Sequence, residues 1–156
     1  MTKTIVLAVD TTSHVASAAE VTADLAARAG DRVIVLHVHE FAVGRFGRIQ
    51  VDCIENEGER VADEIVRRLR DAGVTATTEI RKTPVGHIAR TIMATADEVG
   101  AWMIILGSTT AHDVPRLPFG STSLRLLHMS DKPVLIVPRS QEAPSVPEPA
   151  AATASS

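Results

Sequence analysis

Three hydroxyl residues that follow a glycine are the part of this sequence whose types and spacing best suit chemistry. Gly120 precedes Ser121, Thr122 and Ser123 at the point where a helical pattern begins. The first N–H groups of a helix have no partner within it, and with the helix dipole they favour anions. Hydroxyl groups can add donors to a phosphate. Taken by itself, however, the pattern favours simple helix capping by Ser121 over phosphate binding.

The patterns that mark common enzymes and metal sites are missing from the sequence. It has no G-x-x-x-x-G-K-[ST] loop, whose lysine serves the terminal phosphates of a nucleotide, and no G-x-S-x-G turn. A phosphoacceptor domain needs two or three carboxylates after its first strand, whereas Asp10 stands alone there. His37 and His39 share one face of a predicted strand, and the other four histidines have no companion ligand at metal spacing. We predict no catalytic residue and no metal site, and the sequence leaves slow hydrolysis of ATP open.

Short apolar runs alternate with longer helical patterns along the chain, which is typical of strand–helix–strand units and a parallel sheet. Strands are predicted at residues 5–9, 32–38, 74–80, 103–106 and 134–137. The strand at 74–80 is the most polar, so we expect it at an edge of the sheet. Residues 39–50 are predicted to form a loop, because Gly44 and Gly47 interrupt the pattern.

Four helices are predicted between these strands. The first has Ala18, Val21, Leu25 and Ala29 at helical spacing and ends at Gly30. The second spans about 54–72, with an i,i+4 pair of Glu64 and Arg68 on its outer face. The third is expected to start at Thr83-Pro84, since proline suits the first helical position, and its apolar face contains Ile88, Ile92, Ala96 and Val99. The fourth begins at about Ser121.

These elements predict an α/β fold, with an open, doubly wound, five-stranded parallel sheet and helices on both faces. In such sheets ligands bind beyond the carboxyl ends of the strands, where the strand order reverses. The rule indicates three segments: residues 10–13, the chain from Val38 onward, and the loop after Leu106.

Composition limits the organisation and the partners of the chain. The 156 residues suit one domain, predicted at 1–139, followed by a Pro-, Ala- and Ser-rich tail at 140–156 that we expect to be disordered. The net charge of −3 without a basic stripe argues against nucleic acid. No apolar run approaches the roughly 18–20 residues that span a membrane. With one cysteine and no signal peptide, we expect a cytoplasmic protein.

Several ordered motifs together resemble the universal stress protein family. The loop from Gly107 to Ser121 is similar to that family's ATP loop, G-x-x-G, nine residues, then G-[ST], with Gly107 and Gly120 as its first and last glycines. Four further stretches match in order along the chain: Ile5-Val6-Leu7-Ala8-Val9-Asp10, Leu36-His37-Val38, the G-x-x-A motif Gly86-His87-Ile88-Ala89, and Lys132-Pro133-Val134-Leu135-Ile136-Val137-Pro138. The resemblance covers the chain from about Lys3 to Pro138 and implies a Rossmann-like fold of the adenine nucleotide alpha hydrolase type.

The resemblance also implies an ATP site, with Mg²⁺ as a candidate companion. Asp10 would accept from the ribose or the adenine, unless it only turns the chain into the first helix with Ser13. Val38 would meet the adenine through its backbone, and Gly107 would permit close backbone approach. The phosphates would lie at the start of the last helix. The full set of expected nucleotide contacts is Val9, Asp10, Val38, Leu106, Gly107, Thr110, Gly120, Ser121 and Thr122.

Two residues depart from the family pattern. Thr110 replaces the second glycine of G-x-x-G, where a β-branched residue disfavours positive φ, and Trp102 stands where the family usually has aspartate. Our first hypothesis is an ATP-binding stress-response protein with a regulatory rather than a catalytic role. The alternative is a nucleotide-free homodimeric interaction module. The resemblance implies that homodimers form through the final strand, Val134–Val137.

Overall fold

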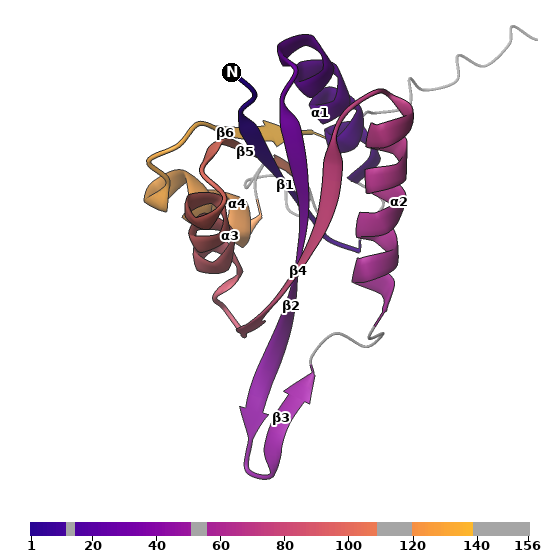
Figure 1. Cartoon of the computed structure of the whole chain (residues 1–156). Helices are drawn as coiled ribbons and strands as arrows, with labels where there is room; N and C mark the ends of the chain where they lie inside the picture. The colour runs from indigo at the N-terminus through magenta and orange to yellow at the C-terminus, as the bar shows by residue number, and fades with distance from the viewer. Residues whose placement is uncertain (12–14, 51–55, 109–119, 139–156) are drawn as a thin grey trace, which may run out of the picture.

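Six strands and four helices make up the part of the chain that the computed structural model describes, which is residues 1–11, 15–50, 56–108 and 120–138 (Figure 1). The strands are β1 (Thr4–Val9), β2 (Arg32–Gly44), β3 (Gly47–Gln50), β4 (Ala76–Pro84), β5 (Ala101–Gly107) and β6 (Val134–Val137). The helices are α1 (Val15–Ala29), α2 (Glu57–Asp71), α3 (Ile88–Glu98) and α4 (Ser121–Met129).

Five of the strands pair in parallel, in the order β4, β2, β1, β5, β6. From β1 the chain moves outward to β2 and β4, then returns to β5 and β6 on the other side of β1. The strand order therefore reverses between β1 and β5, which is where such sheets place a ligand site. This confirms the predicted fold class and the edge position of the polar strand β4.

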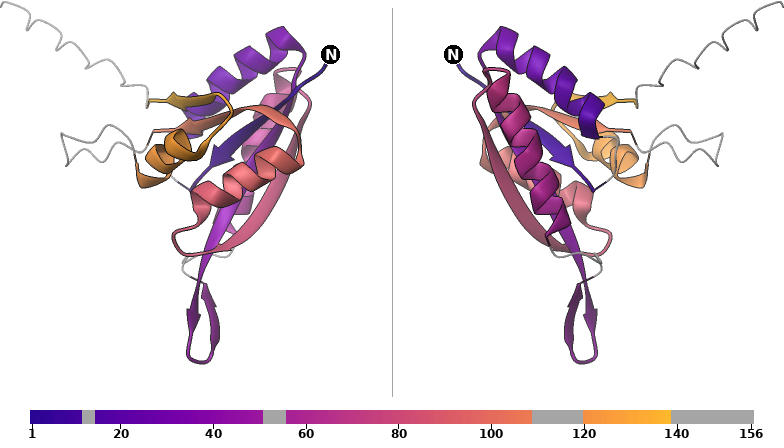
Figure 2. Two further views of the ribbon diagram at one scale, coloured as in Figure 1. Left: turned by 90° about the vertical axis from the view of Figure 1, so that its left-hand side faces the viewer. Right: turned by 90° about the vertical axis from the view of Figure 1, so that its right-hand side faces the viewer.

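Helices cover both faces of the sheet, so the central strands are buried on both sides (Figures 1 and 2). On one face α1 and α2 pack on Ile5, Leu7 and Ile105, while on the other α3 and α4 pack on Val6 and Ile104. Neighbouring residues of a strand point to opposite faces, which is why the continuous apolar runs were readable as doubly covered strands.

The predicted apolar face of α1 was right only in part. Ala18 is buried and Val21 packs against the core, but Leu25 and Ala29 are exposed. The buried residues of the helix are Val15, Ala18, Ala19, Thr22 and Ala26. Small side chains let this helix lie close to the sheet. The buried Thr22 hydroxyl donates a hydrogen bond to the Ala18 carbonyl oxygen (2.7 Å). The predicted end was right, since Gly30 adopts φ 67°, the left-handed conformation that glycine permits after a helix. The predicted pair of Glu64 with Arg68 on α2 is also confirmed, at 3.2 Å.

The predicted loop at 39–50 is instead a β-hairpin. Strand β2 continues to Gly44, reverses through a two-residue turn, and pairs antiparallel with β3 from Phe41↔Gln50 to Gly44↔Gly47. Figure 2 shows this hairpin projecting beyond the helices. The two glycines flank the turn, and they mark a chain reversal between paired strands rather than the loss of strand structure.

Thr83 and Pro84 end β4 and do not start α3, contrary to the prediction. Proline is tolerated here because β4 is an edge strand that pairs only with β2 among the described residues. A turn at Gly86 follows, with φ 84°, and α3 begins at Ile88 after His87 as its N-cap residue.

At the opposite edge of the sheet from the strands' carboxyl ends, a buried carboxylate joins three segments. Asp31 is 5% exposed, and it accepts hydrogen bonds from the Lys3 backbone N–H (2.9 Å) and from Trp102 Nε1 (2.9 Å). The Lys3 ammonium lies 5.1 Å from the centroid of the Trp102 ring. The tryptophan that departs from the family pattern therefore holds the start of β5 against the start of β1.

Several predictions concern residues outside the described ranges: Ser13, Thr110 and the tail at 140–156. Within the described ranges no helix is long and apolar enough to cross a membrane. Among the same residues, no group of three or more His, Cys, Asp or Glu side chains is arranged to hold a metal ion.

Candidate functional site

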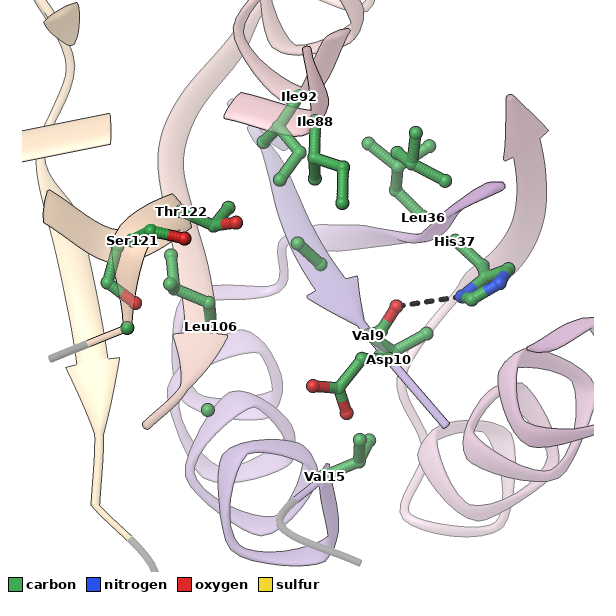
Figure 3. Close-up of a pocket in the computed structure, with 15 residues that line it drawn as sticks. Val9, Asp10, Val15, Leu36, His37, Ile88, Ile92, Leu106, Ser121 and Thr122 are labelled. Carbon is green, nitrogen blue, oxygen red and sulfur yellow. Dashed lines mark hydrogen bonds between the residues drawn. The ribbon is translucent and has the colours of Figure 1, made fainter. Parts of the chain in front are cut away.

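A pocket of about 200 Å³ lies at the carboxyl ends of β1 and β5 and beside the middle of β2, where the strand order reverses (Figure 3). The first turn of α4 and the first turns of α3 complete its walls. Its described lining residues are Ala8, Val9, Asp10, Val15, Leu36, His37, Val38, Ile88, Ile92, Leu106, Gly107, Gly120, Ser121, Thr122 and Ser123. Each wall thus comes from a different part of the sequence, and only the folded sheet brings them together.

The end of β1 is held in place by a buried histidine from β2. His37 is 5% exposed and donates from Nδ1 to the Val9 carbonyl oxygen (2.9 Å), as the dashed line in Figure 3 shows. The distal side of its ring faces α2 at Gly58, where a Cβ would lie 1.9 Å from His37 Nε2. The glycine therefore lets α2 close over the ring, and the ring fixes the backbone from which Asp10 extends.

The exposed Asp10 carboxylate points into the pocket toward the side where Ser121 and Thr122 lie (Figure 3). A carboxylate in this place can accept hydrogen bonds from the hydroxyl or amino groups of a ligand. The alternative role for Asp10, a helix turn shared with Ser13, involves a residue outside the described ranges.

The first turn of α4 presents backbone donors to the pocket. Its N-cap residue is Gly120, in an extended conformation (φ −66°, ψ 163°), and this residue has no side chain with which to cap the helix. The interpretation of Ser121 as the cap was therefore wrong, because Ser121 is the first helical residue. Among the described residues, no cap side chain competes for the first N–H groups of α4, and a helix end of this kind favours an anion.

The remaining wall of the pocket is aliphatic. Ile88 and Ile92 come from α3, Leu36 from β2 and Leu106 from β5. Such a surface suits the face of a flat, uncharged ring, while the polar groups of Asp10 and α4 lie at its margin. The pocket therefore combines an apolar wall with an anion-favouring helix end.

The start of α3 is tied to two other walls of the pocket through Gly86. The Gly86 N–H donates to Glu40 Oε1 on β2 (2.7 Å), and Arg125 Nη1 on α4 donates to the Gly86 carbonyl oxygen (2.7 Å). These two hydrogen bonds fix the turn from which Ile88 projects. They also link α4, whose N-terminus faces the pocket, to the base of the hairpin.

Eight of the nine predicted contact residues line this pocket, and Thr110 lies outside the described ranges. The sequence did not indicate Ile88 and Ile92 as site residues, because their helical spacing assigned them only to the core. The available signal was their position just after a strand-to-helix turn, since the start of such a helix lies at the carboxyl edge of the sheet. Ala8, Val15, Leu36 and His37 were also missed, while Ser123, which the sequence indicated as a hydroxyl donor, lines the pocket although it was not in the set of expected contacts.

The model of the family described as "Universal stress protein family" matches residues 1–138. No curated protein sequence matches the chain at a significant level.

Solved structures are similar in fold across most of the chain. A universal stress protein from Archaeoglobus fulgidus has a TM-score of 0.71 at 22% identity, covering 88% of this chain and 99% of that one. A universal stress protein from Archaeoglobus fulgidus in complex with dAMP has a TM-score of 0.60 at 23% identity, with 86% and 97% covered. A universal stress protein in complex with cAMP has a TM-score of 0.64 at 21% identity, with 89% and 98% covered.

Proposed function

The chain belongs to the universal stress protein family, and we propose that it is an ATP-binding member whose nucleotide has a regulatory rather than a catalytic role. One observation carries the proposal. Eight residues expected to contact the nucleotide, which are spread from Val9 to Thr122 in the sequence, line a single pocket at the switch point of the sheet. Two solved structures of similar fold are complexes with dAMP and with cAMP, which supports an adenine nucleotide as the ligand class.

In the proposed complex the adenine lies against the aliphatic wall formed by Ile88, Ile92 and Leu36. The Val38 backbone contacts the base, and Asp10 accepts a hydrogen bond from the ribose or the base. The phosphates lie at the first turn of α4, where backbone N–H groups and the hydroxyls of Ser121 and Thr122 donate to them. This arrangement uses each wall of the pocket for the part of the nucleotide that matches its polarity.

The charge of the pocket favours phosphate binding with a counterion. No lysine or arginine is among its described lining residues, and Asp10 adds a negative charge. Donors from the helix end offset part of the phosphate charge, but ATP carries more charge than one helix terminus balances. We therefore expect Mg²⁺ to accompany ATP, and we expect AMP, with less charge to neutralise, to depend less on Mg²⁺.

The direct test is calorimetric titration of ATP with Mg²⁺ into protein purified free of nucleotide. We expect micromolar affinity and, at a ligand concentration of about 100 times Kd, a stabilisation of about 2.7 kcal/mol. Titrations of ATP without Mg²⁺ and of AMP with and without it test the role assigned to the ion. Absence of both heat and thermal stabilisation would contradict the proposal.

Two variants test the placement of the phosphates. Gly120→Val adds a side chain at the rim of the pocket, and valine readily adopts the extended backbone found there, so the fold should persist. We expect it to weaken ATP binding at least tenfold. Thr122→Val removes one hydroxyl donor at nearly constant shape and should cost about 0.5–1.5 kcal/mol of binding. Thr77→Val, the same change at an exposed position of β4 outside the pocket, is the matched control.

A second candidate function, as a homodimeric interaction module, is supported by the exposed end of the sheet. Strand β6 pairs only with β5 among the described residues, and Leu135 and Ile136 remain half-buried in the single chain. Leu127 and Met129 on the neighbouring α4 are each 46% exposed. A sheet edge beside exposed apolar side chains is suited to pairing with a second copy.

Light scattering tests this dimer directly. We expect a dimer at micromolar concentration that Leu127→Ser and Met129→Ser together weaken, whether or not nucleotide is bound. A monomeric wild-type protein would contradict it. The cytoplasmic location expected from the sequence stays a prediction.

A further inference from the structure

Among the residues that the structure describes, no other segment covers the tip of the hairpin formed by β2 and β3. We define the arm as residues 41–50, in which the last residues of β2 pair with β3. Figures 1 and 2 show the arm projecting beyond the helices and the rest of the sheet. Arg45 and Phe46 form the turn at its end.

The apolar side chains of the arm are exposed to an extent that hairpin formation does not require. Phe46 is fully exposed (102%) and Val43 is 75% exposed. Tight hairpin turns favour Gly, Asn or Asp, and the reversal here already uses Gly47 at φ 123°. The Phe46 ring is therefore not packed against the described part of its own chain, and its burial against another surface would be favourable.

The backbone of the arm is also incompletely paired. Among the described residues β3 pairs only with β2, over four residue pairs. A two-stranded hairpin without further packing is at best marginally stable in water, and its free edge can pair with another chain. Covering the arm would therefore stabilise both its side chains and its strands.

Charge indicates what covers it. The arm contains Arg45 and Arg48 and no acidic residue, whereas the whole chain has a net charge of −3, so the rest of the chain carries −5. The Arg48 guanidinium lies 4.8 Å from the centroid of the Phe41 ring, which holds it along the arm. We call the rest of the chain the body; of its charge of −5, the described residues carry −2. Because the body is net acidic, a basic and apolar arm is complementary to the body of another copy of the same chain.

We propose that the arm packs against the body of a second copy of this chain, with Phe46 as its apolar anchor and Arg45 and Arg48 facing acidic side chains. This contact does not depend on nucleotide binding, and it is separate from the proposed pairing of β6. An anionic membrane is a poorer match for the arm, because the −5 charge on the rest of the chain opposes approach to anionic lipid.

Sedimentation equilibrium of the full chain over a range of concentrations tests the contact. We expect Phe46→Ser to raise the dissociation constant at least tenfold, as expected for the loss of an aromatic anchor. The double variant Arg45→Glu, Arg48→Glu should weaken association similarly, and raising the salt concentration should weaken the wild type. Phe46 is fully exposed in the single chain, so unchanged thermal unfolding of dilute Phe46→Ser protein is the folding control.

Leu25→Ser is the matched control, because it removes another exposed apolar side chain, on α1 and outside both proposed contacts. Loss of association with Phe46→Ser but not with Leu25→Ser supports the arm contact. Association that Phe46→Ser leaves unchanged, while Leu127→Ser with Met129→Ser weakens it, belongs to the β6 side and overturns the proposal, as does a wild type that stays monomeric at all concentrations. Phe46-dependent binding to vesicles of phosphatidylcholine and phosphatidylserine, without self-association, would assign the arm to a lipid surface instead.

Discussion

Gly58→Ala should destabilise the protein, although the same change in most helices stabilises them. Alanine exceeds glycine in helix propensity by about 1 kcal/mol, which is the expected gain at an unobstructed position. Here the added Cβ would lie 1.9, 2.2 and 2.5 Å from three atoms of the His37 ring. These distances are far shorter than van der Waals contact distances, so the ring or the helix must move.

The size of the loss follows from what His37 does. The ring is buried and donates to the Val9 carbonyl oxygen (2.9 Å), so moving it weakens a hydrogen bond worth about 0.5–1.5 kcal/mol. Overpacking of a closed core adds about 1–3 kcal/mol. After subtraction of the helix-propensity gain, we expect Gly58→Ala to lower the free energy of unfolding by about 1–3 kcal/mol.

A double-mutant cycle separates this clash from other effects. In a His37→Val background the distal ring atoms are gone, so Gly58→Ala should become neutral or stabilising by up to about 1 kcal/mol. Urea unfolding followed by circular dichroism gives the four free energies. Nucleotide titration of Gly58→Ala adds a functional readout, because Val9 and His37 line the pocket and weaker binding is expected. A Gly58→Ala protein more stable than wild type, or the same effect in both backgrounds, would refute the reasoning.

Three further predictions concern single contacts outside the pocket walls. Trp102→Phe removes a donor from the buried Asp31 carboxylate and should cost about 1–3 kcal/mol of stability in urea unfolding; an unchanged midpoint would contradict this tie between β1 and β5. Gly86→Ala should cost about 1–2 kcal/mol of stability because of its φ of 84°, and not because of a clash, since the nearest atom to the added Cβ is 3.9 Å away. An unchanged midpoint of urea unfolding for Gly86→Ala would count against backbone strain. The hydrogen bond to Asp97 raises the pKa of Lys132 above its ordinary value of 10.5, so their contribution to stability is present below that pH and disappears as pH rises through the raised pKa. The stability difference between wild type and Asp97→Asn should accordingly shrink in alkaline solution, and a difference that persists there would argue against the ion pair.

The sequence alone determined which five segments form the parallel part of the sheet and at which edge of it the pocket lies. Continuous apolar runs such as residues 5–9 and 134–137 are the direct consequence of burial on both faces, so they are visible without a structure. Gly120 followed by Ser121 and Thr122 marked the start of α4 correctly. Both signals are local, because burial of a whole strand and the beginning of a helix are written into neighbouring residues.

The hairpin and the end of β4 needed information that neighbouring residues do not contain. Gly44 and Gly47 look like interruptions until β3 is seen to pair with β2 across them. Pro84 looks like a helix start until β4 is seen to be an edge strand, where a missing N–H is tolerated. In both cases the outcome was decided by which strand lies alongside, and strand pairing is a property of the tertiary structure.

The sequence predicted one side of the pocket, and only the tertiary structure revealed the other. Its polar side was predictable, because a helix start and a strand-terminal aspartate have characteristic sequences. Its aliphatic wall was not, because Ile88 and Ile92 have the same spacing as core residues, and only the crossing of α3 over the carboxyl edge leaves them facing open space. The contact of Gly58 with His37 likewise joins residues 21 positions apart, since only the packing of α2 on β2 brings a helix backbone within reach of a buried ring.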